Sequence, residues 1–258
     1  MKIRIKFKKY GVMKFIGHLD VMRFFQKAIR RADIDIKYSE GFSPHQIMSF
    51  AAPLGVGIES MGEYLDIEVN SLTSTEAMKT ALNAVMVEGI SVVSVKVLPD
   101  TVKNAMASVA AAEYQISCQK ERTSDITDVI EIEDIERKLA EFYAQEHIFV
   151  VKKTKKGTAE IDLKPHIYKL EMIEAVNPFS EISEDIKSES ITRVISMLVD
   201  ASSSGNIKPK MVLEAFYKYC GIALPTIPWQ IIRIETYTEA DGKDGKAFVP
   251  LEAVGTDQ

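Results

Sequence analysis

Two histidines, each inside a short motif, are the residues near the start of the chain whose types and spacing suit chemistry. His18 lies in the run FIGHLD (15–20), and His45 ends the run YSEGFSPH (38–45). Imidazole changes its charge near neutral pH, so it can act as a general acid or base and can bind an anion. The motifs therefore mark a candidate site for phosphate chemistry. His18 and His45 are its candidate catalytic residues, and no catalytic residue is assigned beyond them.

The second motif contains residues that shape a loop. Gly41 can adopt backbone conformations that are closed to other residues, and Pro44 favours an extended conformation at Ser43. Such a turn can direct His45 outward and expose backbone N–H groups. Together with nearby arginines, these groups can form a cradle for an oxyanion or a phosphate.

A basic helix is predicted over residues 18–32, between the two motifs. Apolar residues recur at i, i+3, i+7 and i+10, and this stripe is expected to be buried: Met22, Phe25, Ile29 and Ala32. A separate cationic stripe recurs at i, i+4 and i+7: Arg23, Lys27 and Arg30. His18 stands at the N-terminus of this helix, where unpaired N–H groups and a partial positive charge suit an anion.

We expect the helix and the loop to form one cationic cleft, with the basic run KKTKKG (152–157) as a second phosphate contact. The predicted binding residues are Lys14, His18, Arg23, Lys27, Arg30, Tyr38, Gly41, Phe42, Ser43, His45, Lys155 and Lys156. Aromatic residues among the bases can stack on nucleobases: Phe24, Tyr38 and Phe42. Each feature also has a structural alternative. His18 can cap the helix, His45 can hold the loop, Phe24 can belong to the core, and the lysine run can be a solvated hairpin.

Other kinds of site find no support in the sequence. It has no dinucleotide-binding or Walker-type glycine loop, no serine nucleophile elbow and no H-E-x-x-H motif. It also lacks the cysteine cluster of an iron–sulfur site, and its four histidines lack close metal spacing. We therefore expect no metal and no cofactor. Asp162 and His166 are spaced so that they can pair.

The charge is unevenly distributed along the chain. The 258 residues carry a net charge of −5, but residues 1–45 hold eleven basic and four acidic side chains. An acidic protein with a local basic face can still bind a polyanion. No window approaches the roughly 18 apolar residues of a membrane span, and the start lacks the apolar core of a signal peptide. A cytoplasmic protein is expected.

The elements that must position these residues alternate between strands and helices. Residues 2–8 alternate with period two and predict a half-buried strand with a cationic outer face: Lys2, Arg4, Lys6 and Lys8. Further strands are predicted at 34–38, 46–52, 63–69 and 90–98, with a helix at 75–87. The second half repeats this order more loosely. The predicted fold class is α+β, with two tandem ferredoxin-like (split βαβ) domains and mainly antiparallel sheets. The expected divisions are a domain at 1–98, a linker at 99–110, a domain at 111–238 and a hairpin or tail at 239–258.

The motifs of the first half carry a resemblance to a known family. FIGHLD (15–20), Arg30-Arg31-Ala32, YSEGFSPH (38–45) and FAAPLG (50–55) resemble the radical-SAM-linked protein family. This is a bacterial domain-of-unknown-function family, found alone or fused to B12-binding-type radical SAM proteins. The resemblance implies a radical SAM partner, encoded nearby or fused, and it supplies no established activity.

Three functions are compatible with these features. The first is a non-catalytic accessory module that presents RNA, tRNA or rRNA, to a radical SAM enzyme, because the chain itself lacks the cluster cysteines. The second is a metal-independent RNA-processing enzyme with His18 and His45 as acid and base, which requires both imidazoles in one cleft. The third is a protein–protein adaptor for the radical SAM partner. The basic face and the predicted fold are also similar to RNA-binding and CRISPR-type RNA-processing proteins, which is an analogy of fold alone.

Overall fold

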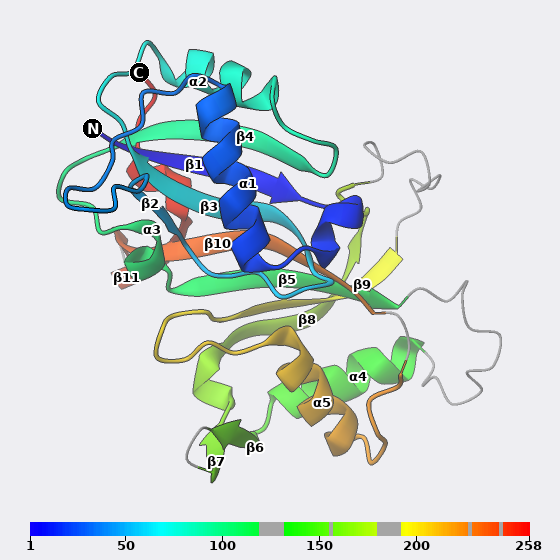
Figure 1. Cartoon of the computed structure of the whole chain (residues 1–258). Coiled ribbons are helices and arrows are strands. Elements are labelled where there is room, and N and C mark those ends of the chain that lie inside the picture. Colours follow the sequence, from blue (N-terminus) through cyan, green and yellow to red (C-terminus); the bar gives the residue numbers. More distant parts are fainter. Residues whose placement is uncertain (119–131, 155–156, 180–191, 227–228, 243–244) are drawn as a thin grey trace. The chain divides into compact units, whose positions relative to one another are not determined.

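The computed structural model of the chain describes residues 1–118, 132–154, 157–179, 192–226, 229–242 and 245–258. These residues form a mixed α+β fold with five α-helices and strands that pair mostly antiparallel (Figure 1). The chain divides into two compact units. Unit 1 contains residues 1–111 and 233–258, and unit 2 contains residues 112–232.

Unit 1 is built on a sheet in which β1 lies between β3 and β4. Both neighbours run antiparallel to β1, and β2 pairs antiparallel with β3. Its elements are β1 (Lys2–Lys9), η1 (Gly11–Phe15), α1 (His18–Arg31), β2 (Met48–Phe50), β3 (Glu59–Glu68), α2 (Thr75–Asn83), β4 (Ile90–Leu98), α3 (Ala105–Ser108), most of β10 (Trp229–Gly242), β11 (Gly245–Pro250) and η4 (Leu251–Val254). Figure 1 shows α1 lying across one face of this sheet.

The helix α1 is held on the sheet by its apolar side. Phe25 and Ile29 are fully buried as the helical periodicity predicts, and Phe25 packs against Phe7 of β1 with ring centroids 4.6 Å apart. Val21 and Ala28 complete the buried stripe in place of Met22 and Ala32, which were predicted to be buried and are half-buried. Burying two such large apolar side chains contributes roughly 3–6 kcal/mol to stability, which fixes the orientation of the opposite, polar side.

The predicted strands around the loop are shorter in the structure. Residues 34–38 form no strand and contribute isolated bridges, Ile36 to Val69 and Tyr38 to Gln46. The strand predicted at 46–52 is reduced to β2, and the helix predicted to reach residue 87 ends at Asn83. The cap of that helix is Ser74, whose side chain accepts a hydrogen bond from a backbone N–H of the first turn.

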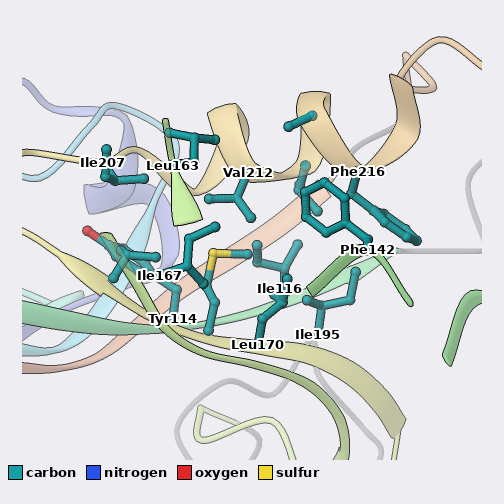
Figure 2. Close-up of a cluster of buried hydrophobic side chains, with 14 of the residues drawn as sticks. Tyr114, Ile116, Phe142, Leu163, Ile167, Leu170, Ile195, Ile207, Val212 and Phe216 are labelled. Carbon is teal, nitrogen blue, oxygen red and sulfur yellow. The ribbon is translucent and has the colours of Figure 1, made fainter. Parts of the chain in front are cut away.

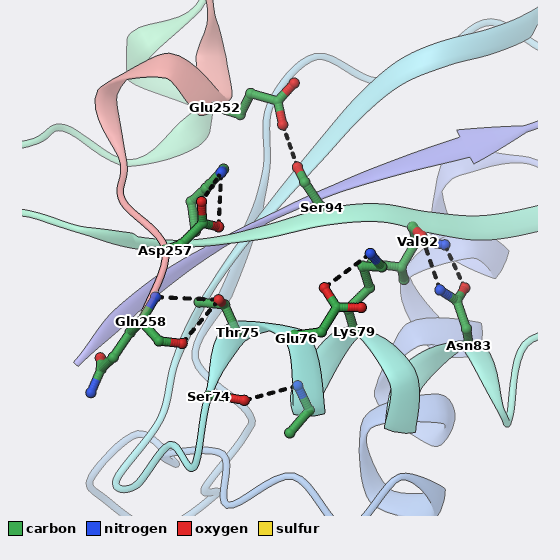
Figure 3. A network of polar contacts seen from close by, with 12 residues as sticks. Ser74, Thr75, Glu76, Lys79, Asn83, Val92, Ser94, Glu252, Asp257 and Gln258 are labelled. Carbon is green, nitrogen blue, oxygen red and sulfur yellow. Dashed lines mark hydrogen bonds and ion pairs between the residues drawn. The ribbon is translucent and has the colours of Figure 1, made fainter.

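The last residues of the chain are fastened to α2 and β4. Figure 3 shows Gln258 bonded to Thr75 at the start of α2 through both backbone and side-chain groups. Asp257 forms an ion pair with Lys96 of β4, and the Glu252 carboxylate accepts from the Ser94 hydroxyl. The segment 251–258 therefore belongs to the polar side of the unit 1 sheet.

Unit 2 has its own hydrophobic core, drawn in Figure 2. Its elements are β5 (Ala111–Cys118), α4 (Ile132–Tyr143), β6 (Phe149–Thr154), β7 (Gly157–Asp162), η3 (Lys164–His166), β8 (Ile167–Ala175), β9 (Thr192–Asp200) and α5 (Pro209–Tyr219). The strand β9 lies between β5 and β8, and β8 runs antiparallel to it. Phe142 of α4 and Phe216 of α5 meet edge to face at 5.6 Å within this core.

Candidate functional site

The cationic stripe of α1 points into solvent. Arg23, Lys27 and Arg30 are all exposed, on the side opposite the buried stripe. Arg23 pairs with Asp20 at 3.5 Å, a contact that is weak because both side chains are mostly exposed, and the Arg30 Nε donates to a backbone carbonyl of its own helix. The positive charges of these three side chains are therefore accessible to a partner and only weakly neutralised.

The loop that follows α1 lies against the same helix. The Gln46 side-chain amide donates to the backbone carbonyl of Gln26, which stands in the turn of α1 between Arg23 and Arg30. Gln46 itself is buried. The bridge from Tyr38 to Gln46 closes the base of this loop, so that residues 38–46 stand beside the cationic stripe. We call the surface formed by these two segments the α1–loop surface. Its predicted members are Arg23, Lys27, Arg30, Tyr38, Gly41, Phe42, Ser43 and His45.

The loop itself is shaped by hydrogen bonds around Ser39 and His45. The Ser39 backbone N–H donates to the His45 carbonyl at 2.8 Å, and the Ser39 hydroxyl contacts His45 Nδ1 at 2.9 Å. The His45 backbone N–H also donates to that hydroxyl. Gly41 has φ of +108°, a conformation that an L side chain rarely adopts, which explains the glycine. His45 therefore holds the loop, as the structural alternative stated, and its ring remains exposed.

The aromatic residues of the motif divide into two groups. Phe42 is fully exposed, at 112% of its reference area, and Tyr38 is 45% exposed. Phe24 is half-buried and packs against Phe25 with ring centroids 5.7 Å apart, so it belongs with the core. Tyr38 and Phe42 are the rings that remain accessible for stacking.

The cationic outer face predicted for β1 is wrong, because its two central charges are paired with carboxylates and the first of them is buried. Arg4 is 0% exposed, and it binds both oxygens of Asp66, at 2.8 and 2.9 Å. Lys6 binds Glu235 at 2.6 Å and Glu252 at 2.7 Å. The sequence pattern could not reveal this, because two of these carboxylates come from the far end of the chain.

The ionisation of this network follows from its contacts. Burial alone would lower the pKa of Lys6, but the hydrogen bonds that its ammonium donates to Glu235 and Glu252 outweigh burial and raise that pKa. Burial and the neighbouring Glu235 carboxylate both raise the pKa of Tyr64, whose hydroxyl donates to Glu235 at 2.8 Å. Lys6 therefore stays protonated, and its ammonium is bound by two carboxylates of the same unit. Lys14 is also paired, with Glu59 at 3.5 Å.

His18 lines a small cavity at the N-terminus of α1, to which the loop at 38–46 contributes no residue. The cavity leaves about 20 Å³ for a water-sized group. Its lining is Phe7, Lys9, His18, Val21, Phe50, Ala52, Pro53, Leu54 and Glu63, with none of the other predicted binding residues. The His18 ring meets Phe50 edge to face at 5.3 Å. Two motifs of the sequence, FIGHLD (15–20) and FAAPLG (50–55), therefore meet here.

Sequence patterns did not identify the charged residues that line this cavity. Lys9 is 2% exposed, and its ammonium donates to the carbonyl of Ile16 at 3.0 Å. Glu63 accepts from Arg233 at 2.9 Å, a contact over 170 positions of sequence that no local pattern signals. Burial lowers the pKa of Lys9, Glu63 partly opposes that effect, and Arg233 adds to it.

The histidines of unit 2 pair with carboxylates, though in a different combination from the one predicted. Asp162 bonds to His147 at 2.8 Å, and His166 bonds to Asp200 at 2.9 Å. The predicted pairing of Asp162 with His166 is therefore wrong. The His147 hydrogen bond, with backbone N–H donors, holds the pKa of Asp162 at about 2.

The remaining predicted contacts, Lys155 and Lys156, lie outside the described residues. Within the described ranges, no group of three or more histidine, cysteine or acidic side chains is placed to hold a metal ion. No helix in that part of the chain is long and apolar enough to cross a membrane.

Comparison with models of protein families gives a match. The model of a family described as "Uncharacterized protein conserved in bacteria (DUF2344)" matches residues 2–209. The matched range contains α1, the loop at 38–46 and both motifs that line the cavity. No curated protein matches the sequence.

Proposed function

The chain belongs to this DUF2344 family of bacterial proteins, and from that premise we propose that it is a non-catalytic RNA-binding accessory module. In this proposal the α1–loop surface holds RNA, tRNA or rRNA, for a radical SAM enzyme. The partner enzyme is proposed from the resemblance of the motifs FIGHLD (15–20), YSEGFSPH (38–45) and FAAPLG (50–55) to the radical-SAM-linked family.

One observation carries the RNA proposal. Arg23, Lys27 and Arg30 are exposed on one side of a helix whose other side is fixed in the core. By contrast, Arg4 and Lys6 are held by carboxylates of the same unit. A localised cationic stripe on a protein of net charge −5 is suited to a polyanion, and RNA is the polyanion whose bases the neighbouring exposed rings can also contact.

The strand pairing supports the fold that belongs to this proposal, two tandem ferredoxin-like domains. In unit 1 the chain order is β1-α1-β2-β3-α2-β4, with β1 between β3 and β4 and β2 on β3. In unit 2 the order β5-α4-β8-β9-α5, with the hairpin β6–β7 inserted, has β9 between β5 and β8. The order in unit 1 matches a split βαβ arrangement, and the order in unit 2 matches the first three strands of one.

A filter-binding titration over a range of salt concentrations tests the function. Each phosphate neutralised contributes about −0.7 (single strand) to −0.9 (duplex) to the slope of log K against log salt, so three exposed cations give a slope of about −2 to −3. The double variant Arg23→Ala/Arg30→Ala should retain one of the three cations. At about 0.7–0.9 per phosphate contact, its slope should be nearer −1.

The matched control removes the same formal charge elsewhere. Lys169→Ala/Lys210→Ala replaces two exposed lysines of unit 2, each already near a glutamate, and should bind RNA as the wild type does. No RNA affinity at low salt, or an equal loss in both double variants, would refute the proposed function. Co-purification with a radical SAM protein encoded beside the gene tests the partner, and its absence refutes that part.

A further inference from the structure

The tip of the loop in the α1–loop surface, residues 39–45, carries an aromatic ring and no lysine or arginine. Between Tyr38 and Gln46 the sequence has Glu40 and no lysine or arginine. Both Glu40 and Phe42 are exposed. A carboxylate beside an exposed ring disfavours a phosphate at the tip, so the tip and the α1 stripe are suited to different parts of a nucleotide.

The loop that carries the tip is also closed by its own hydrogen bonds. Ser39 and His45 are joined by a backbone hydrogen bond and by two contacts of the Ser39 hydroxyl, and Gln46 anchors the base of the loop to α1. An aromatic side chain has two rotatable side-chain bonds, so holding it on a closed loop leaves little conformational entropy to lose on binding. Phe42 therefore stands on a closed loop, with its ring fully accessible to a stacking base.

We propose that the α1–loop surface takes single-stranded RNA, with an unpaired base stacked on Phe42 and the phosphates of the same strand along Arg23, Lys27 and Arg30. This inference rests on the proposed RNA-binding function and names its substrate class. A base inside a duplex is stacked on both faces by its neighbours, whereas an unpaired base presents a free π-face to an aromatic side chain. Tyr38, on the same loop and 45% exposed, is the second ring available to the strand.

A pocket on a protein partner is the competing occupant for Phe42. The neighbouring cations favour RNA, because a single strand offers phosphates to the cations and bases to the ring. A protein pocket would need an apolar rim, whereas the exposed residues beside this ring include Glu40, Ser43 and His45.

The test compares one RNA oligonucleotide, single-stranded and in a blunt duplex, by fluorescence anisotropy with wild type, Phe42→Ala, Phe42→Leu and Phe42→Trp. The Leu variant keeps apolar bulk without a ring, and the Trp variant keeps a ring. Stacking on an aromatic residue is worth about 1–3 kcal/mol per base, so Ala and Leu should weaken single-strand binding about 5- to 150-fold. Their duplex binding should change less than about twofold on the same reasoning, and Trp should bind like the wild type.

A fluorescent base analogue gives a second readout. A 2-aminopurine in the single strand should be quenched on binding the wild type and Phe42→Trp, and not on binding Phe42→Leu. Phe15→Ala is the control for loss of an exposed ring in the same unit, since Phe15 is 63% exposed and lies outside the surface, and it should behave as the wild type.

The outcomes separate this inference from the function on which it rests. Unchanged single-strand affinity in Phe42→Ala, with salt-dependent loss in Arg23→Ala/Arg30→Ala, overturns the stacking inference and leaves RNA binding standing. Equal affinity for single strand and duplex overturns it in the same way. If Phe42→Ala no longer co-purifies with the radical SAM protein but still binds RNA, Phe42 belongs to a protein interface instead. No RNA binding by the wild type refutes both.

Discussion

Removing the Asp66 carboxylate should destabilise unit 1 strongly, because it leaves a charged arginine buried without its counterion. The Arg4 side chain is 0% exposed, and two of its nitrogens donate to Asp66. In Asp66→Ala the guanidinium keeps only backbone oxygens, those of Leu251 and Lys103. Breaking a buried pair by removing one partner costs about 3–5 kcal/mol. With a urea m-value of about 2 kcal/mol/M, the unfolding midpoint should fall by about 2 M.

The matched variants separate burial of charge from simple loss of a contact. Arg4→Met/Asp66→Leu replaces both charges by apolar side chains and should be near the wild type, or more stable by about 1–4 kcal/mol. Asp257→Ala removes an ion pair whose acid is 75% exposed, and should cost less than about 1 kcal/mol. The reasoning is refuted if Asp66→Ala unfolds within about 1 kcal/mol of the wild type, a size typical of exposed pairs. A double variant as unstable as the single one would also refute it.

Three further predictions concern single contacts. Ser74→Ala removes the cap of α2 and should lower the free energy of unfolding by about 1 kcal/mol in urea titrations; no change would contradict the cap. Gly205→Ala should destabilise unit 2, because its Cβ would lie 2.1 Å from the Asp200 carboxylate; hydrogen exchange of β9 as slow as in the wild type would contradict that. The pKa of Asp162, held at about 2 by His147, lies below its ordinary value of 3.8. Its contribution to stability should therefore be present above about pH 4 and fall as the pH drops from 3.8 towards 2. In His147→Ala, an NMR titration should show the pKa of Asp162 rising part of the way towards 3.8, because the backbone N–H donors of Ile148 and Lys164 remain. An unchanged value there would refute the contribution of His147.

Local periodicity predicted the elements well, because it depends on neighbours in the sequence. The apolar spacing of Phe25 and Ile29 predicted α1, and the alternation of residues 2–8 predicted β1. The period-two pattern also identified which side of β1 carries charge. The pattern could not show whether that side is exposed to solvent or covered by other parts of the chain. Its carboxylate partners, Glu235 and Glu252, are too distant in the sequence for a local pattern to include them.

The candidate site was predictable in part for the same reason. The stripe of Arg23, Lys27 and Arg30 follows from helical spacing alone, and it is exposed as a separate stripe should be. The position of His18 depended on tertiary packing, which brings it against Phe50 in a cavity that His45 does not line.

The distance along the chain between the partners of the β1 network has a consequence for the order of folding. Arg4 and Lys6 lie 247 and 246 positions before the residues that complete their contacts, Leu251 and Glu252. Contacts of such separation form late, because loop closure must be achieved before they contribute. During synthesis from the N-terminus, β1, β3 and β4 can pair, and Asp66 of β3 can already neutralise Arg4, while Lys6 still lacks both of its carboxylates. The nascent sheet therefore carries one unneutralised cation, Lys6, on the face that Glu235 and Glu252 later cover.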